Sequence, residues 1–177
     1  MVTLHAARTD TVARSVLQEF RALLDSAFEG DFTDEDWAHT TGGVHVWLSG
    51  SGGVISHASI VERRLECSGQ PLRVGYVEAV ATAVAHRRQG HGASIMRHIG
   101  ELIRERYVLG ALSTGAHAFY EAFGWERWRG LSFVDSPRGR ERTPEDDGTI
   151  MILQTRRSPR LDLDGHIACD WRPGDVW

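Results

Sequence analysis

The feature that most constrains this chain is a long β-prone run that leads through a glycine loop into a helix. Residues 72–84 read Leu-Arg-Val-Gly-Tyr-Val-Glu-Ala-Val-Ala-Thr-Ala-Val, which is typical of a strand. Gly90 and Gly92 follow, and residues 93–107 then carry apolar side chains at three- and four-residue steps. Because a helix that opens after such a turn directs its first N–H groups at the turn, this segment predicts an anion site.

The loop itself reads Arg87-Arg88-Gln89-Gly90-His91-Gly92. Its glycines allow a tight turn and leave N–H groups unobstructed, while the arginines add cationic donors. The segment therefore predicts a seat for a pyrophosphate. It is neither a P-loop, because no Gly-Lys-Ser/Thr follows, nor a dinucleotide fingerprint, because the Gly-x-Gly-x-x-Gly spacing is missing. The alternative is a tight strand–helix turn without a ligand.

The remaining pattern predicts helices and strands in an order that fits an α+β fold. We expect helices over 12–28, 33–39, 93–107 and 117–123, strands over 44–48, 54–67, 72–84, 109–113 and 149–155, and short strands over 125–128 and 132–134. The tail from residue 158 has little pattern beyond residues 167–171. Residues 137–148 are expected to form a polar excursion. Three successive strands joined by short turns give an antiparallel meander. The whole chain, residues 1–177, is predicted to be one α+β domain with a mixed sheet.

Composition excludes several classes of protein. The net charge of −4 argues against nucleic acid as a partner, since phosphate contacts need a basic face. No stretch approaches the ~20 apolar residues of a membrane span, and the first ten residues do not resemble a signal peptide. The two cysteines, Cys67 and Cys169, are expected to be buried free thiols of a cytoplasmic protein, although a disulfide stays open.

Acidic residues occur in runs rather than evenly. One run lies within residues 31–36, a second at 145–147, and a third along the tail from residue 162. If the runs converge in space, they form a site for a polycation. The alternative is that each run is a solvated surface segment.

The glycine loop resembles that of the GNAT superfamily, in which an Arg/Gln-x-x-Gly-x-Gly/Ala motif binds the pyrophosphate of acetyl-CoA. Arg87, Gly90 and Gly92 match that motif. The resemblance implies the GNAT fold, a central mixed, mostly antiparallel sheet flanked by helices. It also implies that the cofactor lies along the end of the long strand and the loop, at Val80, Ala81, Thr82, Arg87, Arg88, Gln89, Gly90, His91, Gly92 and Ala93.

A closer resemblance covers nearly the whole chain and points to the aminoglycoside 2′-N-acetyltransferase family. It is carried by residues 28–33, Asp36-Trp37, residues 39–45, 75–80 and 143–148, and by the ending Cys-Asp-Trp-Arg-Pro-Gly-Asp-Val-Trp at 169–177. By this resemblance the enzyme acetylates the 2′-amine of aminoglycosides and forms a homodimer. It has no nucleic-acid or membrane partner.

The resemblance assigns substrate contacts to acidic positions. Aminoglycosides are polyamines that are mostly cationic at neutral pH, so carboxylates should line their site. Asp31, Asp36 and Asp146 match such positions, and Ser113 and the carboxylate of Trp177 are further contacts. Asp36 is equally explained as an acid in the first turn of a helix, and Asp31 as a turn residue after Gly30.

Two residues receive catalytic roles by resemblance. Glu78 lies in the middle of a strand, where a carboxylate is a poor β former, and it would act through water as general base on the substrate ammonium. Tyr120 would protonate the CoA thiolate, because a phenol and a thiol have comparable pKa values. The alternatives are an exposed strand residue for Glu78 and a core tyrosine for Tyr120.

Two other readings of the chemistry are weaker. The nine histidines show no His-x-x-x-His spacing with a carboxylate partner, so we expect no metal. A GNAT enzyme acting on another polyamine or a protein amine stays open, as does a non-catalytic protein that binds the drug or acetyl-CoA. Release of the CoA thiol would separate an enzyme from a binder.

Overall fold

The structure is a computed structural model that describes Met1 to Trp177, and its residue contacts divide the chain into two units. The first unit comprises Met1–Val61 and Val77–Ile99, and the second comprises Glu62–Tyr76 and Gly100–Trp177. Two long strands and one helix therefore contribute residues to both units, and each unit is described by itself.

The first unit contains an antiparallel sheet. Strand β1 pairs with β2, β2 pairs with β3, and β4 lies next to β3. Its elements are β1 (Thr3–Arg8), the 3₁₀ turn η1 (Thr9–Thr11), α1 (Arg14–Ala27), α2 (Asp34–Thr40), β2 (Val44–Gly50), η2 (Val84–His86) and parts of β3 (Gly53–Cys67), β4 (Gln70–Thr82) and α3 (His91–Arg106).

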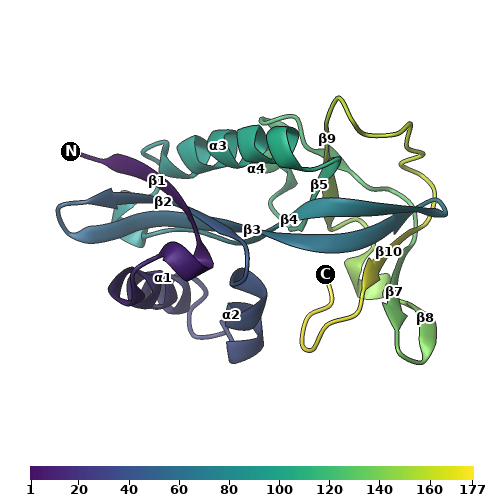
Figure 1. Cartoon of the computed structure of the whole chain (residues 1–177), viewed down its shortest axis with the longest axis horizontal. Coiled ribbons are helices and arrows are strands. Elements are labelled where there is room, and N and C mark those ends of the chain that lie inside the picture. Colours follow the sequence, from purple (N-terminus) through teal and green to yellow (C-terminus); the bar gives the residue numbers. More distant parts are fainter. The chain divides into compact units, whose positions relative to one another are not determined.

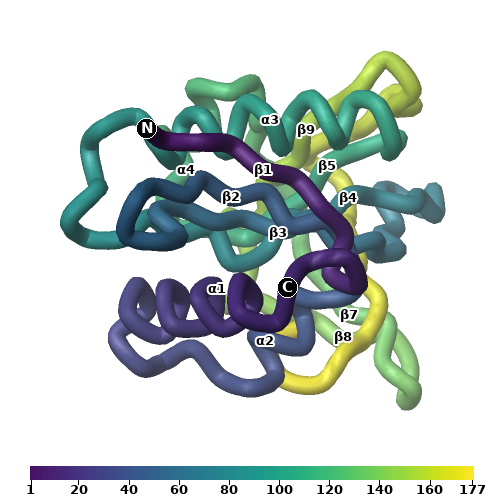
Figure 2. The backbone as a smooth tube through the Cα atoms, turned by 60° about the vertical axis from the view of Figure 1, so that its left-hand side comes forward, coloured from purple at the N-terminus to yellow at the C-terminus, as the bar shows by residue number.

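Helix α1 covers one face of this sheet, as its apolar spacing predicts. Phe20, Leu23 and Leu24 are buried, and the Phe20 ring contacts the rings of His45 and His57 at centroid distances of 5.1 and 4.5 Å. In Figures 1 and 2, α1 and α2 lie on one side of strands β2 and β3, and α3 lies on the other. The sheet of the first unit is thus flanked by helices, as expected.

The second unit contains the mixed part of the sheet. Its strand order is β6-β9-β5-β4-β3-β10-β7-β8. The pairs β4–β5 and β10–β7 are parallel, and the pairs β10–β3, β5–β9, β6–β9 and β7–β8 are antiparallel. The further elements are β5 (Leu109–Ser113), α4 (His117–Glu121), β6 (Glu126–Arg127), β7 (Ser132–Ser136), β8 (Gly139–Arg142), η3 (Pro144–Asp146), β9 (Ile150–Gln154) and β10 (Ile167–Asp170).

The predicted α+β class and the mixed, mostly antiparallel sheet are confirmed, but the strands β1, β8 and β10 were not predicted. Strand β1 was missed because its residues are exposed or half-buried without an apolar alternation. Strand β8 lies inside the segment expected to be a polar excursion, and all four of its residues are exposed. Its hairpin with β7 is supported by ion pairs, such as Arg140 with Asp135 at 2.7 Å, which apolar patterning does not reveal.

Two further expectations have an outcome. Cys67 and Cys169 are both buried and free, and burial raises the pKa of each thiol to about 12. A disulfide, the alternative that the sequence left open, is therefore absent. No helix in the structure has the length and apolar character needed to cross a membrane.

Candidate active site

The glycine loop connects β4 to the N-terminus of α3 within the first unit. Gly90 has φ +83° and an added Cβ would meet no atom within 4 Å, so glycine is needed there for its conformation and not for space. The carbonyl of Gly90 accepts the hydrogen bond of Ser94 N over 3.0 Å, which opens the helix. The first N–H groups of α3 have no acceptor within the helix, and such groups can bind an anion.

The basic residues of this loop differ in what they contact. Arg87 donates from Nε to the carbonyl of Thr82 over 3.2 Å, so it braces the loop against the end of β4. Arg88 is exposed and has φ +60°, an unusual backbone conformation for a residue with a side chain. Gln89 donates to the Ala85 carbonyl over 3.1 Å. The loop is thus folded back on its own main chain.

The end of β4 departs from a regular strand at Ala79, which has φ +52°. Two side chains of β3 form hydrogen bonds with main-chain carbonyls before and after Val80. His57 Nδ1 lies 3.0 Å from the Ala79 oxygen, and Ser56 Oγ donates to the Ala81 oxygen over 2.8 Å. Glu78, directly before Ala79, is half-buried. The predicted base therefore lies next to a strained residue that β3 holds in place.

The two acids predicted near α2 differ in their surroundings. Asp31 is exposed, and its N–H donates to the Phe28 carbonyl over 2.9 Å. Asp36 completes a capping box: its carboxylate accepts from Thr33 N over 2.8 Å, and its own N–H donates to Thr33 Oγ1 over 3.1 Å. The sequence offered a first-turn acid as the alternative for Asp36, and the capping box gives Asp36 such a structural role in the first turn of α2. A role in substrate binding would be additional to it.

In the second unit, Ser113 and Asp146 are brought together through Thr149. The Oγ atoms of Ser113 and Thr149 lie 2.9 Å apart, and Thr149 Oγ1 donates to the Asp146 carbonyl over 2.9 Å. Because Thr149 has one hydroxyl proton and the carbonyl is only an acceptor, the proton between the two hydroxyls comes from Ser113. Ser113 therefore presents lone pairs outward, which suits an N–H or O–H donor such as an aminosugar.

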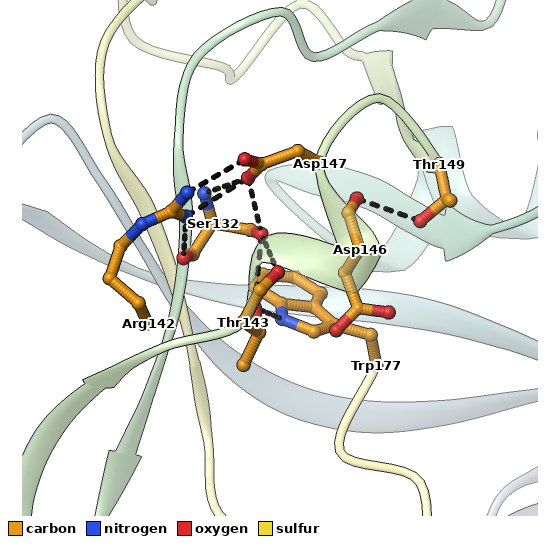
Figure 3. A network of polar contacts seen from close by, with 7 residues as sticks. All are labelled: Ser132, Arg142, Thr143, Asp146, Asp147, Thr149 and Trp177. Carbon is orange, nitrogen blue, oxygen red and sulfur yellow. Dashed lines mark hydrogen bonds and ion pairs between the residues drawn. The ribbon is translucent and has the colours of Figure 1, made fainter.

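Asp146 and Asp147 are consecutive but have opposite environments, as Figure 3 shows. Asp147 accepts from Arg142 over 2.7 Å and from Ser132 over 2.8 Å, and these hydrogen bonds, that of Arg142 first, lower its pKa. Asp146 is directed toward Trp177 in this view, and burial, reinforced by Asp175 and Glu145, raises its pKa to about 6. Asp147 is a structural anion, whereas Asp146 is a desolvated carboxylate without a cation partner in this network.

Trp177 is anchored in the same network. Its indole Nε1 donates to Thr143 Oγ1 over 3.0 Å, and Thr143 Oγ1 donates to Ser132 Oγ over 2.9 Å. The side chain is only 3% exposed. Its main-chain oxygen, which was expected to contact the substrate, already accepts one hydrogen bond from Arg172 over 3.1 Å.

Tyr120 lies on α4 and is 7% exposed. Burial raises the pKa of its phenol to about 12, and a hydrogen bond with Thr114 opposes that rise. The phenol is therefore fully protonated at neutral pH and able to donate. This raised pKa differs more from that of a thiol, about 8.5, than the ordinary tyrosine pKa of about 10 does.

The predicted site residues thus fall into two groups. Residues 31, 36, 78, 80–82 and 87–93 belong to the first unit, and Ser113, Tyr120, Asp146 and Trp177 belong to the second. Sequence reasoning missed the residues that hold them: Ser132, Thr143, Asp147 and Thr149 in the second unit, and His45 and His57 in the first. Asp147 was noted only as part of an acidic run, and the histidines only as unsuited to a metal.

Comparisons with known proteins identify the family. Residues 8–128 match the model of the acetyltransferase (GNAT) domain. An aminoglycoside 2′-N-acetyltransferase of Mycolicibacterium fortuitum is 41% identical over 98% of this chain and 93% of its own length.

Solved structures with low identity share the fold. The GNAT family N-acetyltransferase YhbS of Escherichia coli, in complex with CoA, has a TM-score of 0.68 at 15% identity and covers 95% of this chain and 89% of its own. The ribosomal-protein-S18-alanine N-acetyltransferase of Escherichia coli has a TM-score of 0.61 at 17% identity. The match covers 90% of this chain and 96% of that protein's chain. The chain is therefore an acetyltransferase of the GNAT superfamily and a member of the aminoglycoside 2′-N-acetyltransferase family.

Proposed function

We propose that this enzyme transfers the acetyl group of acetyl-CoA to the 2′-amine of aminoglycoside antibiotics. The observation that carries the substrate class is the acceptor cluster of the second unit, in which Ser113 exposes lone pairs and the Asp146 carboxylate has a hydrogen bond with Thr143 but no cation partner in its network. A polycation supplies the charge that Asp146 lacks. Asp31, Asp36 and the main-chain oxygen of Trp177 are proposed as further contacts for amines and hydroxyls.

The proposed cofactor site uses the end of β4 and the glycine loop. The register between β4 and β5 covers Val74 to Tyr76, and β4 itself continues to Thr82. The main chain of Val80, Ala81 and Thr82 is therefore proposed to bind the pantetheine arm as a neighbouring strand would. The N–H groups from Gly90 to Ala93, with Arg87, Arg88, Gln89 and the His91 main chain, bind the pyrophosphate.

The proposed chemistry is direct transfer and needs no metal ion. Glu78 accepts, through water, the proton that the 2′-ammonium loses, and the amine nitrogen then bonds to the thioester carbonyl carbon. The N–H of Val80 donates to the carbonyl oxygen as negative charge develops there. The carbon–sulfur bond breaks as the phenol of Tyr120 donates its proton to the departing thiolate, and the second proton lost by the acylated nitrogen restores the phenol, so that CoA leaves as the thiol. Holding both reactants in one site supplies much of the rate.

Two aminoglycosides that differ at one position test this proposal. Tobramycin carries a 2′-amine and kanamycin A a 2′-hydroxyl, so we expect CoA thiol release with tobramycin only. Mass spectrometry should find one added acetyl group, and NMR should locate it on the 2′-nitrogen. Equal release with both drugs would overturn the position of transfer.

Two other results would point to the remaining readings. Tobramycin binding without thiol release would favour a non-catalytic binder. Thiol release with spermidine or a peptide amine, but with neither drug, would favour a GNAT enzyme for another amine. The homodimer implied by the family resemblance stays a prediction, which light scattering of the purified protein can test.

A further inference from the structure

A chain of buried hydrogen bonds ends on the irregular residue of β4. Thr9 Oγ1 lies 2.9 Å from His45 Nε2, His45 Nδ1 lies 2.9 Å from His57 Nε2, and His57 Nδ1 lies 3.0 Å from the Ala79 carbonyl oxygen. Both imidazoles have no exposed surface, and Phe20 covers them from α1. A fully buried histidine pair needs a reason, because each ring nitrogen must find a partner.

The direction of every proton in this chain follows from its end. A carbonyl only accepts, so His57 carries its proton on Nδ1 and accepts at Nε2. His45 then donates from Nδ1 and accepts at Nε2 from the Thr9 hydroxyl, for which the Gly43 carbonyl at 3.3 Å is a more distant acceptor and which itself accepts from Gly42 N over 3.0 Å. Burial keeps both rings neutral and lowers the pKa of His45 to about 4. For His57, burial and then the nearby His45 ring lower the pKa to about 3. A single tautomer of each ring satisfies the chain.

This series of hydrogen bonds cannot serve as a proton relay, because the Ala79 carbonyl has no proton to pass on. Its effect is on the geometry of one peptide unit. In a trans peptide the C=O of residue 79 and the N–H of residue 80 point in opposite directions, and no peptide of this chain is cis. A hydrogen bond that fixes the Ala79 carbonyl therefore fixes the direction of the Val80 N–H and strengthens it as a donor by polarising the peptide.

Ala79 would not adopt its conformation unaided. Its φ of +52° is disfavoured for a residue with a Cβ, and a relaxed residue 79 would rotate the peptide that follows. We infer that His57 is a positioning residue, which orients the Val80 N–H toward the thioester oxygen through the Ala79 carbonyl, with His45 and Thr9 selecting its tautomer. This inference rests on the proposed role of the Val80 N–H.

The test compares two replacements of His57. His57→Phe fills the buried site without a donor, whereas His57→Asn keeps an N–H close to the position of Nδ1. We expect His57→Phe to lower kcat with tobramycin by about tenfold to a hundredfold, somewhat less than the loss of a complete oxyanion donor, with little change in KM for the drug. His57→Asn should recover most of kcat.

A suppressor and a matched control sharpen the test. Ala79→Gly removes the steric cost of positive φ, so the double variant with His57→Phe should regain part of kcat. Ser59→Ala is the control, because Ser59 lies two residues along β3, is fully buried, and its Oγ makes no hydrogen bond. Its kcat should match that of the unaltered enzyme. Equal kcat losses in His57→Phe and His57→Asn, or none in either, would overturn the inference.

A second readout does not depend on the substrate. NMR of the unaltered protein should show the His57 proton on Nδ1, and the Cα shift of Ala79 and the amide shift of Val80 should change in His57→Phe but much less in His57→Asn. Unchanged shifts would refute the positioning role even if the enzyme is active. Changed shifts in a protein that acetylates neither drug would instead retain the positioning and reject the proposed function.

Discussion

The Oγ atoms of Ser113 and Thr149 lie 2.9 Å apart, and Thr149 also donates to the Asp146 carbonyl over 2.9 Å. One threonine thereby fixes the hydroxyl of one proposed substrate contact and the main chain of another. The pair lies where β5 ends and β9 is about to begin, since Ser113 pairs with Ile150.

Replacing this threonine should weaken drug binding specifically. In Thr149→Val the Ser113 hydroxyl loses its acceptor and rotates, and the Asp146 carbonyl loses one of its two donors, because the Thr149 N–H stays 3.0 Å away. We expect KM for tobramycin to rise severalfold, in line with about 1 kcal/mol for a neutral hydrogen bond, with KM for acetyl-CoA unchanged. Thr149→Ser keeps the hydroxyl and should behave as the unaltered enzyme. Equal rises in both KM values would contradict this role.

Asp146 should oppose folding at neutral pH. Its pKa is raised from 3.8 to about 6, chiefly by burial, so the folded state binds the proton more tightly than the unfolded state. The ionised Asp146 therefore lowers the free energy of unfolding. This decrease is absent below about pH 4, grows as the pH rises, and is complete above about pH 6. We expect Asp146→Asn to raise Tm at pH 7.5 and to lose that gain at pH 4, while its KM for tobramycin increases.

The neighbouring carboxylate provides a control of opposite sign. Hydrogen bonds with Arg142 and Ser132 lower the pKa of Asp147, so its contribution to stability is present above its unfolded pKa and is lost as the pH falls. Asp147→Asn should therefore lower Tm at neutral pH, with a smaller effect in acid. If both variants change Tm in the same direction at pH 7.5, the environments of Asp146 and Asp147 do not differ as the geometry indicates.

This contrast illustrates how far sequence reasoning reached. The acidic run at 145–147 is visible in the sequence, but only the fold decides that Asp147 meets Arg142 of strand β8 while Asp146 is directed toward Trp177. Strand β8 itself was not predicted, because it is held by strand pairing and ion pairs and not by an apolar pattern. A local rule, by contrast, found the helix that begins after Thr33, since a capping box needs only residues close in the chain.

The histidine chain marks the same boundary. His45 and His57 are twelve residues apart, on two strands whose register pairs His45 with Ser59 and Trp47 with His57. No local spacing places their rings in contact, and the fact that residue 79 has positive φ is not evident from an alanine. The long strand and the glycine loop were found because their geometry is set by neighbouring residues.

The glycine loop should depend on backbone conformation alone at Gly90. Because a Cβ there meets nothing within 4 Å, Gly90→Ala is disfavoured only by its φ of +83°, at about 1 kcal/mol or more. Relaxation of that strain turns loop N–H groups away from the pyrophosphate, so KM for acetyl-CoA should rise. Gly139→Ala, with φ +119° and equally open space, should lose similar stability and keep its KM. An unaltered KM in both variants would remove the loop from the cofactor site.

Tyr120 should be a weak general acid for the departing thiolate. Its pKa of about 12 makes full transfer to a thiolate, whose conjugate thiol has a pKa of about 8.5, unfavourable. We expect Tyr120→Phe to lower kcat by about tenfold to a hundredfold, at the lower end for acid catalysis, with KM for tobramycin nearly unchanged. The alkaline limb of the kcat profile below pH 10 should persist in the variant, and its disappearance would contradict this protonation state.

Glu78 should control the acid limb of the rate. If its carboxylate removes the proton of the 2′-ammonium, Glu78→Gln keeps the size and polarity of the side chain but cannot act as a base. We expect kcat with tobramycin to fall by about 10²- to 10⁴-fold and the acid limb of the pH profile to flatten, with KM for acetyl-CoA little changed. The control is Glu62→Gln, which loses a surface ion pair with Arg73 and should retain full activity. A variant at position 78 with unaltered kcat and an unaltered acid limb would require another base, since the direct attack needs a neutral amine.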